Sequence, residues 1–236
     1  MRKAWLWGIA GVMAMAGCMA MAQAADDGDA QMAKQCPDMA AWIQAKKAEV
    51  AAQRKAHPPT HPTQPALRAE LLKMSDADQK ARNAVIADGG KHAASIKAML
   101  AVDARNRPRI KQIDAKQGFP TRAQVGSDGV DAAWLLVQHA DSDPAFQARV
   151  LAELRPRLHD GGISAQDFAL LTDRVLVAQH EPQRYGTQFK RVGDELQADP
   201  AEDPANMDKR RLAIGLPPMA DYECVLRVYY HLPARH

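Results

Sequence analysis

Three short polar motifs define the stretch from Trp134 to Gln188, which decides the fold: Trp134-Leu-Leu-Val-Gln-His-Ala-Asp141, Leu171-Thr-Asp-Arg-Val175 and Gln183-Arg-Tyr-Gly-Thr-Gln188. The first motif ends a helix expected over 129–140, whose apolar residues run almost all round, as is typical of a buried helix. Asp143-Pro144 predicts the start of a second helix, because Asp caps helices and Pro suits their first position. Ser164 to Asp167 form a capping-box pattern before a third helix. The stretch therefore predicts three packed helices.

The residues that follow change in character. Glu181-Pro182 ends the third helix, and Tyr185–Val192 has the composition of a strand. Gly193-Asp194 predicts a turn, after which Glu195–Ala198 returns as a second strand. We therefore expect a short β-hairpin near residues 185–198.

Helical patterns also precede the central stretch. We expect a helix at 38–56, two helical pieces over 66–87 divided at an N-cap on Ser75, a helix at 91–103, and another after Pro108. Aromatic residues make up only 5% of the chain and Ala is abundant, which favours helix over sheet. The fold class predicted is mainly α, a single multi-helix domain over 66–236 with one hairpin. Residues 25–65 precede it as an acidic N-terminus, a helix and a Pro-rich strap.

The first 24 of the 236 residues have the pattern of a signal peptide. Arg2 and Lys3 precede an apolar run that is too short to span a bilayer well, and Ala22-Gln-Ala24 fits a cleavage site. Met15-Ala-Gly-Cys18 resembles a lipobox, which would instead leave a lipid on Cys18. We expect a periplasmic or secreted protein, with lipid anchoring through Cys18 as the alternative and the only route to a membrane.

The charge balance argues against nucleic acid as a partner. Removing residues 1–24 leaves 29 Lys and Arg against 28 Asp and Glu, because only Arg2 and Lys3 are lost from the totals of 31 and 28. The resulting net charge, near +1, lacks the basic excess of nucleic-acid binders.

Two cysteines, Cys36 and Cys224, remain after export. An even pair in an oxidising compartment favours a disulfide, which would tie both ends of the chain to one domain. In the chain-entropy description, such a bridge stabilises the fold by roughly 3–5 kcal/mol. Two buried free thiols are the alternative.

Residues from about Ala66 to Tyr222 resemble a bacterial family catalogued as domain of unknown function 6624. The resemblance rests on motifs in a fixed order: Asp78-Gln79 with Arg82, Gly118-Phe-Pro120 with Val125-Gly126, Gln138-His-Ala-Asp141, Leu171-Thr-Asp-Arg-Val175, Gln183-Arg-Tyr-Gly-Thr-Gln188, and Arg211 with Gly215-Leu216 and Tyr222. It implies that these polar positions belong to one arrangement and implies no activity.

The motifs also supply a candidate site. The candidate catalytic residues are His139, Asp173, Arg174 and Tyr185, and the candidate binding residues are Gln138, Asp141, Gln183 and Gln188. His139 would be a general base with a pKa raised by the carboxyl end of its helix. We expect Asp173 to orient His139, while Arg174, which points about 100° away from Asp173 on its helix, reaches Tyr185 or Gln188 as an anion clamp.

Other interpretations compete with a site. The same residues could form a buried polar network that pins loops and satisfies polar groups. His139-x-Asp141-x-Asp143 offers metal ligands, but Asp143 is better used as an N-cap, so no metal or cofactor is predicted.

Two functions stay open. One is a hydrolase-like exported enzyme, and the other is a non-catalytic cell-envelope binding or interaction protein. The partner, a small molecule or an envelope protein, is not identified by the sequence.

Overall fold

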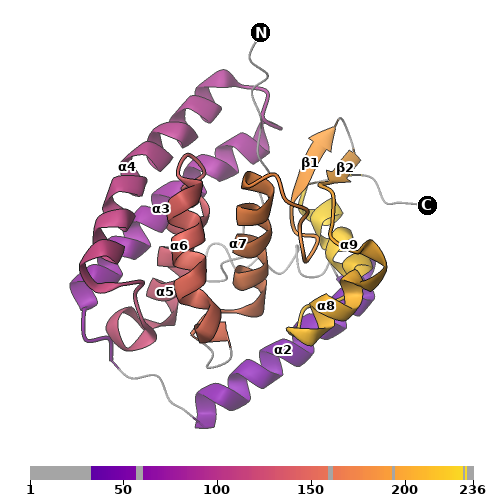
Figure 1. Ribbon diagram of the computed structural model, residues 1–236, viewed down its shortest axis with the longest axis horizontal. Helices are drawn as coiled ribbons and strands as arrows, with labels where there is room; N and C mark the ends of the chain where they lie inside the picture. The colour runs from indigo at the N-terminus through magenta and orange to yellow at the C-terminus, as the bar shows by residue number, and fades with distance from the viewer. Residues whose placement is uncertain (1–32, 57–60, 159–161, 193–194, 231, 233–236) are drawn as a thin grey trace.

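The computed structural model describes residues 33–56, 61–158, 162–192, 195–230 and 232 (Figure 1). The described chain is mainly helical with one two-stranded antiparallel hairpin, which confirms the expected fold class. The expected signal peptide with Cys18, residues 57–60 of the Pro-rich strap and the turn expected at Gly193-Asp194 lie outside the described residues.

The first part of the chain, through α7, forms helices, and the part after α7 forms two strands and two further helices. The helices are α2 (Pro37–Ala56), α3 (Pro65–Ala87), α4 (Ala93–Gln117), α5 (Arg122–Gln138), α6 (Pro144–Leu154), α7 (Ala165–Ala178), α8 (Met207–Ala213) and α9 (Met219–Tyr229). The strands are β1 (Phe189–Val192) and β2 (Glu195–Ala198), paired so that Phe189 faces Ala198. Short 3₁₀ turns occupy Arg155–Leu158 and Pro204–Asn206. Figure 1 shows α3 to α7 grouped together, with the hairpin, α8 and α9 beside α7.

Helix α5 forms the centre of the main core, as its all-round apolar pattern predicted. Every residue from Ala132 to Gln138 is buried, and α3, α4, α6 and α7 all contact the helix. Trp134 is only 1% exposed and packs with core residues from these neighbours. A second, smaller core joins Phe189 of β1 to Tyr222 and Leu226 of α9. The hairpin is therefore anchored on α9 by apolar contacts.

Two expected helix boundaries are wrong, because burial continues across them. Helix α3 is unbroken, and Ser75 does not begin a new helix. Asp78 stands three residues later, where a capping-box partner would stand, but it is 1% exposed and bonded to other side chains. Helix α4 continues through Pro108 although Pro removes a backbone hydrogen bond. Its buried stripe runs on either side of Pro108, from Val102 to Ile110, and we attribute the continuity to that packing.

Helix α5 begins earlier than the expected position near Gly129. Thr121 and Gln124 form a reciprocal capping box before Arg122, and the helix kinks at Gly126, where φ is 75°. Only Gly adopts this left-handed conformation readily. The carboxylate of Asp128 accepts a hydrogen bond from the amide of Gly129 just after the kink. The expected helix is therefore the second part of a longer, kinked one.

The helix starts at Asp143 and Ser164 are as expected. The carboxylate of Asp143 accepts a hydrogen bond from the Phe146 amide, and the Ser164 hydroxyl accepts one from the Asp167 amide. These two caps define the first residues of α6 and α7.

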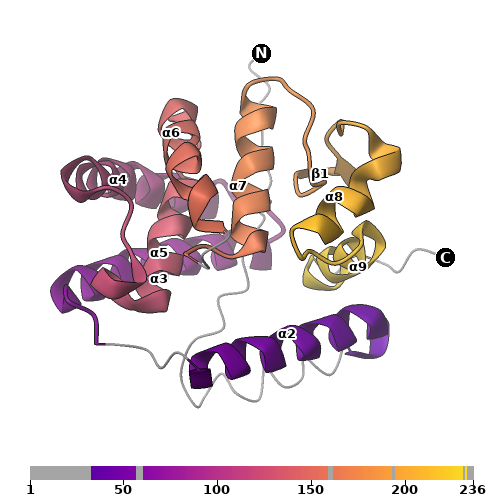
Figure 2. The same cartoon turned by 60° about the horizontal axis from the view of Figure 1, so that its bottom comes forward.

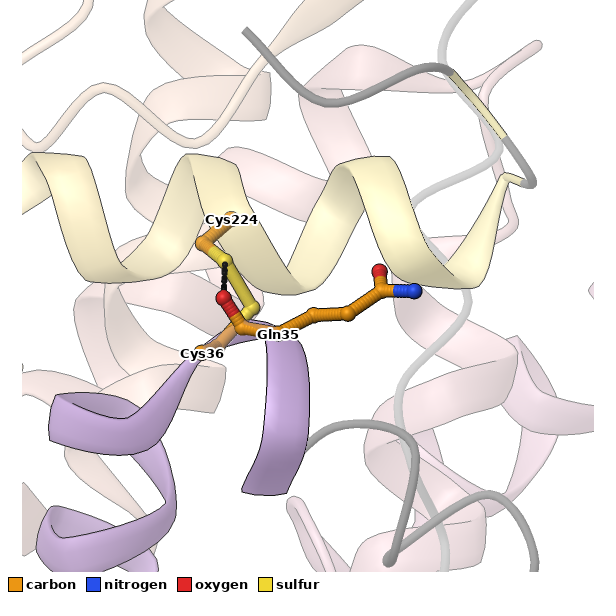
Figure 3. Close-up of a disulfide and its surroundings, with 3 residues drawn as sticks. All are labelled: Gln35, Cys36 and Cys224. Carbon is orange, nitrogen blue, oxygen red and sulfur yellow. Dashed lines mark hydrogen bonds between the residues drawn. A yellow bond between two sulfur atoms is a disulfide. The ribbon is translucent and has the colours of Figure 1, made fainter. Parts of the chain in front are cut away.

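A disulfide joins Cys36 to Cys224, as predicted, and ties the start of α2 to α9 (Figure 3). The Cα atoms are 5.9 Å apart, and Cys36 and Met39 pack with apolar residues of α9. Figure 2 shows α2 lying below the other helices, on the side of α8 and α9. Helix α2 is therefore attached to the rest of the chain mainly through α9.

None of the helices in the described part of the chain is long and apolar enough to cross a membrane.

Candidate functional site

The polar motif residues fall into two groups in the structure. One group surrounds His139, at the end of α5, and includes Asp141 and Arg174. The other surrounds Asp173 and holds the loop before β1. The motifs were expected to form a single arrangement, whereas the structure places their residues in two separate groups.

His139 lies between two residues of α3. Its Nδ1 is 2.8 Å from Oδ2 of Asp78 and 2.9 Å from Nε of Arg82. All three side chains are almost completely buried, and Nε of Arg82 is also 3.2 Å from Oδ2 of Asp78. Asp78 and Arg82 lie four residues apart on α3, so the helix itself places carboxylate and guanidinium on the same face. Asp78 therefore takes the orienting position that was expected for Asp173.

Arg82 extends this group to α4. Its Nη2 donates a hydrogen bond of 2.7 Å to Oδ1 of Asp103, and its Nη1 lies 3.3 Å from the sulfur of Met99. The Asp103 side chain is 18% exposed, whereas that of Arg82 is 6% exposed. Asp103 thus links the buried group to the surface.

Arg174 and Asp141 complete the group on the side of α6 and α7. Nη1 of Arg174 is 2.7 Å from Oδ1 of Asp141, whose side chain is 39% exposed. The amide of Gln147 donates to the same carboxylate oxygen at 3.2 Å and to the carbonyl of Gln138 at 2.8 Å. Asp141 is therefore held in place while remaining in contact with solvent.

The charges in this group act on one another. Burial lowers the pKa of His139, the positive charges of Arg82 and Arg174 lower it further, and Asp78 opposes them. The expectation that the pKa of His139 is raised is wrong, because the effect of the helix end is outweighed by burial. Burial raises the pKa of Asp103 to about 6, with Arg82 opposing the rise and Asp78 adding to it. The group thus pairs a neutral imidazole with a carboxyl that titrates just below neutral pH.

Asp173 belongs to the second group, where it anchors a loop. It accepts hydrogen bonds from the backbone amides of Arg184, Tyr185 and Thr187 and from the Thr187 hydroxyl, at 2.7 to 3.2 Å. The side chain of Asp173 is fully buried. The expected contact between Asp173 and His139 is therefore replaced by a set of backbone contacts.

The other residues of the last motif serve the same loop. Gln183 is fully buried, donates to the carbonyls of Gln188 and Asp199, and accepts from the Gln188 amide at 2.8 Å. The Tyr185 ring packs edge-on against Phe168 at 6.4 Å, and its carbonyl accepts a hydrogen bond of 2.5 Å from Arg211. These contacts form a buried structural network around the loop that precedes β1.

Each predicted site residue can now be placed. His139, Asp141 and Arg174 come together at one end of α5, with the backbone of Gln138 beside them. Asp173 and Arg174 point apart, as their helical spacing predicted. Asp173, Tyr185, Gln183 and Gln188 form the loop anchor, and Arg174 forms an ion pair with Asp141.

Sequence reasoning did not assign three members of the His139 group. Asp78 and Arg82 carried part of the family resemblance, and their spacing of four residues was a usable signal for a shared helix face. Nothing in the sequence distinguished Asp103 from the other acidic residues of surface helices. Among the described residues, no group of three or more His, Cys, Asp or Glu side chains is placed to hold a metal ion.

Comparison with known proteins identifies a family. A family model described as "Family of unknown function (DUF6624)" matches residues 65–235, which is well over half of the chain. No curated protein and no solved structure matches the chain. The chain belongs to the DUF6624 family, as its motifs indicated, and α2 lies before the matched region.

Proposed function

For this member of a family without an assigned activity, we propose an exported hydrolase whose general base is His139. The observation that carries the proposal is the 2.8 Å contact between Nδ1 of His139 and the buried carboxylate of Asp78. A carboxylate that accepts a hydrogen bond from Nδ1–H holds the imidazole in the tautomer whose Nε2 is free to accept a proton.

Asp103 supplies the complementary acid. A carboxyl group with a pKa of about 6 holds its proton at mildly acidic pH and releases it near neutrality. In the proposed reaction, Nε2 of His139 takes a proton from water as the oxygen attacks an ester, amide or phosphoryl centre. The leaving group takes a proton from Asp103, and both residues return to their starting states by exchanging protons with solvent.

The ion pair of Arg174 and Asp141 lies at the exposed edge of this group. Arg174 would stabilise negative charge that develops on the substrate, as arginines do in hydrolytic and phosphoryl-transfer sites. Asp141 is the exposed partner of the pair, with 39% of its side chain exposed against 3% for Arg174. This assignment keeps Arg174 in its expected role and adds Asp141 as its ion-pair partner.

The test is a His139→Gln variant assayed with p-nitrophenyl acetate, p-nitrophenyl phosphate and bis(p-nitrophenyl) phosphate. His92→Gln is the matched control, because His92 is exposed before α4. We expect turnover of at least one substrate to fall by about 100-fold or more in His139→Gln, as for loss of a general base, and to be unchanged in the control. Equal turnover in both variants, together with a lower unfolding midpoint for His139→Gln, would assign His139 to a structural network instead.

The second proposal is a non-catalytic interaction protein of the cell envelope. It is supported by α2, whose first turns pack on α9 while most described side chains after Gln44 are exposed. Val50 on this half of the helix is 44% exposed. A photo-crosslinking residue at position 50 should capture an envelope protein if α2 is a docking helix, and the same residue at exposed Leu100 should not.

A further inference from the structure

Arg82 has the largest set of described contacts in the His139 group. Its guanidinium touches Asp78 on its own helix, His139 at the end of α5, and both Met99 and Asp103 on α4. A planar guanidinium presents five donors in fixed directions, so one side chain can hold partners on different elements. Arg82 therefore joins the proposed base to the proposed acid.

The contacts at Nδ1 of His139 exclude one another. This nitrogen lies 2.8 Å from an oxygen of Asp78 and 2.9 Å from Nε of Arg82. A ring nitrogen that carries a proton donates to the carboxylate, and one without a proton accepts from the guanidinium. When Asp78 is ionised, the first arrangement holds, and Nε of Arg82 donates to Asp78 at 3.2 Å.

The buried carboxylate of Asp78 needs a positive neighbour. Burial alone would raise the pKa of Asp78, but its hydrogen bond to His139 and the charges of His139 and Arg82 lower it. Two groups could supply the positive charge: Arg82, or His139 after taking up a proton. A protonated His139 has no free nitrogen with which to act as a base.

We infer that Arg82 is a positioning residue that supplies the counter-charge of Asp78, so that His139 stays neutral with its proton on Nδ1 and its Nε2 free. The inference rests on the proposed function only in naming His139 as the base. The other charges that act on His139 are Arg174 of α7 and Asp141 of the loop between α5 and α6, and Asp103 of α4 acts through Arg82. Arg174 pairs with Asp141, which leaves Arg82 as the counter-charge in contact with Asp78.

The test follows the imidazole signals of His139 by NMR in the exported, oxidised chain as pH is varied, with assignment by loss of the signals in His139→Gln. In the wild type, we expect His139 to titrate below the ordinary value of about 6.5 and to show a protonated Nδ1. In Arg82→Gln, the midpoint should rise by about one pH unit or more, because His139 then becomes the counter-charge of Asp78.

Arg109→Gln is the matched control. Arg109 joins α4 to Glu70 of α3 by two contacts of 2.5 and 2.8 Å, so its loss also removes an ion pair between the same two helices. The control should leave the midpoint of His139 unchanged. A folded Arg82→Gln variant with an unchanged or lower midpoint would overturn the inference, because the counter-charge of Asp78 would then not depend on Arg82.

Arg82→Lys keeps the inference testable if Arg82→Gln does not fold. An ammonium is a single point charge that cannot hold Asp78 and Asp103 at once. Because Lys keeps the positive charge beside Asp78, we expect the midpoint to rise by less than about one pH unit and any hydrolytic activity to be partly retained. A rise of about one pH unit or more would contradict the inference, because the charge would then not decide the protonation of His139. Because the readout is protonation, a shifted midpoint without turnover of any substrate would reject the hydrolase proposal and leave the role of Arg82 standing.

Discussion

At the scale of single residues, Asp173 shows how a carboxylate can be purely structural. It accepts hydrogen bonds from three backbone amides and one hydroxyl of the loop before β1, while fully buried. Leaving buried donors without an acceptor costs about 1–3 kcal/mol for each group. We therefore expect Asp173→Ala to lower the free energy of unfolding by about 3 kcal/mol or more in urea titrations.

A substitution at Thr187 should lower the free energy of unfolding by less than Asp173→Ala does. Thr187→Val removes one donor to Asp173 and leaves the backbone contacts in place, so it should cost only about 1 kcal/mol. Neither variant should move the titration of His139, because the loop anchor and the His139 group are separate. A shift in that titration would show that the two groups are coupled.

Asp167 gives a prediction for the dependence of stability on pH. Burial raises its pKa to about 7, above the value of 3.8 expected in the unfolded chain. The folded state therefore holds this proton more tightly, and the group costs the fold stability as pH rises from about 4 to 7. Asp167→Asn should gain stability over the wild type between pH 5 and 8, by up to about 3 kcal/mol.

The measurement is chemical unfolding at pH 5, 6, 7 and 8. Asp76→Asn is the control, because Asp76 is exposed on α3 and its replacement should change stability by a similar small amount at each pH. A constant difference between Asp167→Asn and the wild type at all four pH values would contradict the prediction.

At the scale of elements, sequence patterns located most helices but predicted breaks at places where the helices continue. Apolar spacing placed α5, α6 and α7, and capping residues predicted the starts of α6 and α7. The breaks expected at Ser75 and Pro108 are absent because local signals compete with burial, and the packing partners of a helix cannot be read from its own sequence. Asp78 is the clearest case, since it fits a capping box but bonds His139, which lies 61 residues away.

The partners of the candidate site residues were not predicted for the same reason, because packing between helices cannot be read from one helix. Asp173 and Arg174 inside α7 were singled out from the sequence, and their divergence on the helix was predictable from its geometry. Their partners were not predictable, because Asp78 and Arg82 come from a helix that reaches His139 only after folding. The pKa of His139 depends on the same burial, so a rule for helix ends gave the wrong direction.

Helix α2 offers a prediction about one element. Its described packing is mainly on α9, and the disulfide between Cys36 and Cys224 is its covalent tie. After reduction, we expect the amides of α2 to exchange hydrogen faster, while the amides of α5 keep their protection because the main core is unchanged. Cys36→Ser should behave as the reduced protein does, and equal loss of protection in α5 would contradict the prediction.

At the scale of the whole molecule, the family match and the packing divide the chain at the same place. The match begins at residue 65, and the main core draws on α3 to α7 and the loop that follows, without α2. Thr63 and Gln64 pair with the backbone of Ala123 and Gln124, so the segment just before α3 is part of the folded unit. A chain that begins at residue 61 therefore retains the contacts that define the core.

We expect such a chain, carrying Cys224→Ser to remove the unpaired thiol, to unfold in one cooperative transition. Its free energy of unfolding should fall by about 3–5 kcal/mol, because the lost disulfide constrained most of the unfolded chain. The loss should be matched by Cys224→Ser in the full-length chain, since α2 adds little to the main core. A much larger loss on truncation, or a broad non-cooperative transition, would show that α2 is integral to the domain rather than attached to it. Retained titration of His139 in the shortened chain would place the complete candidate site within residues 61–236.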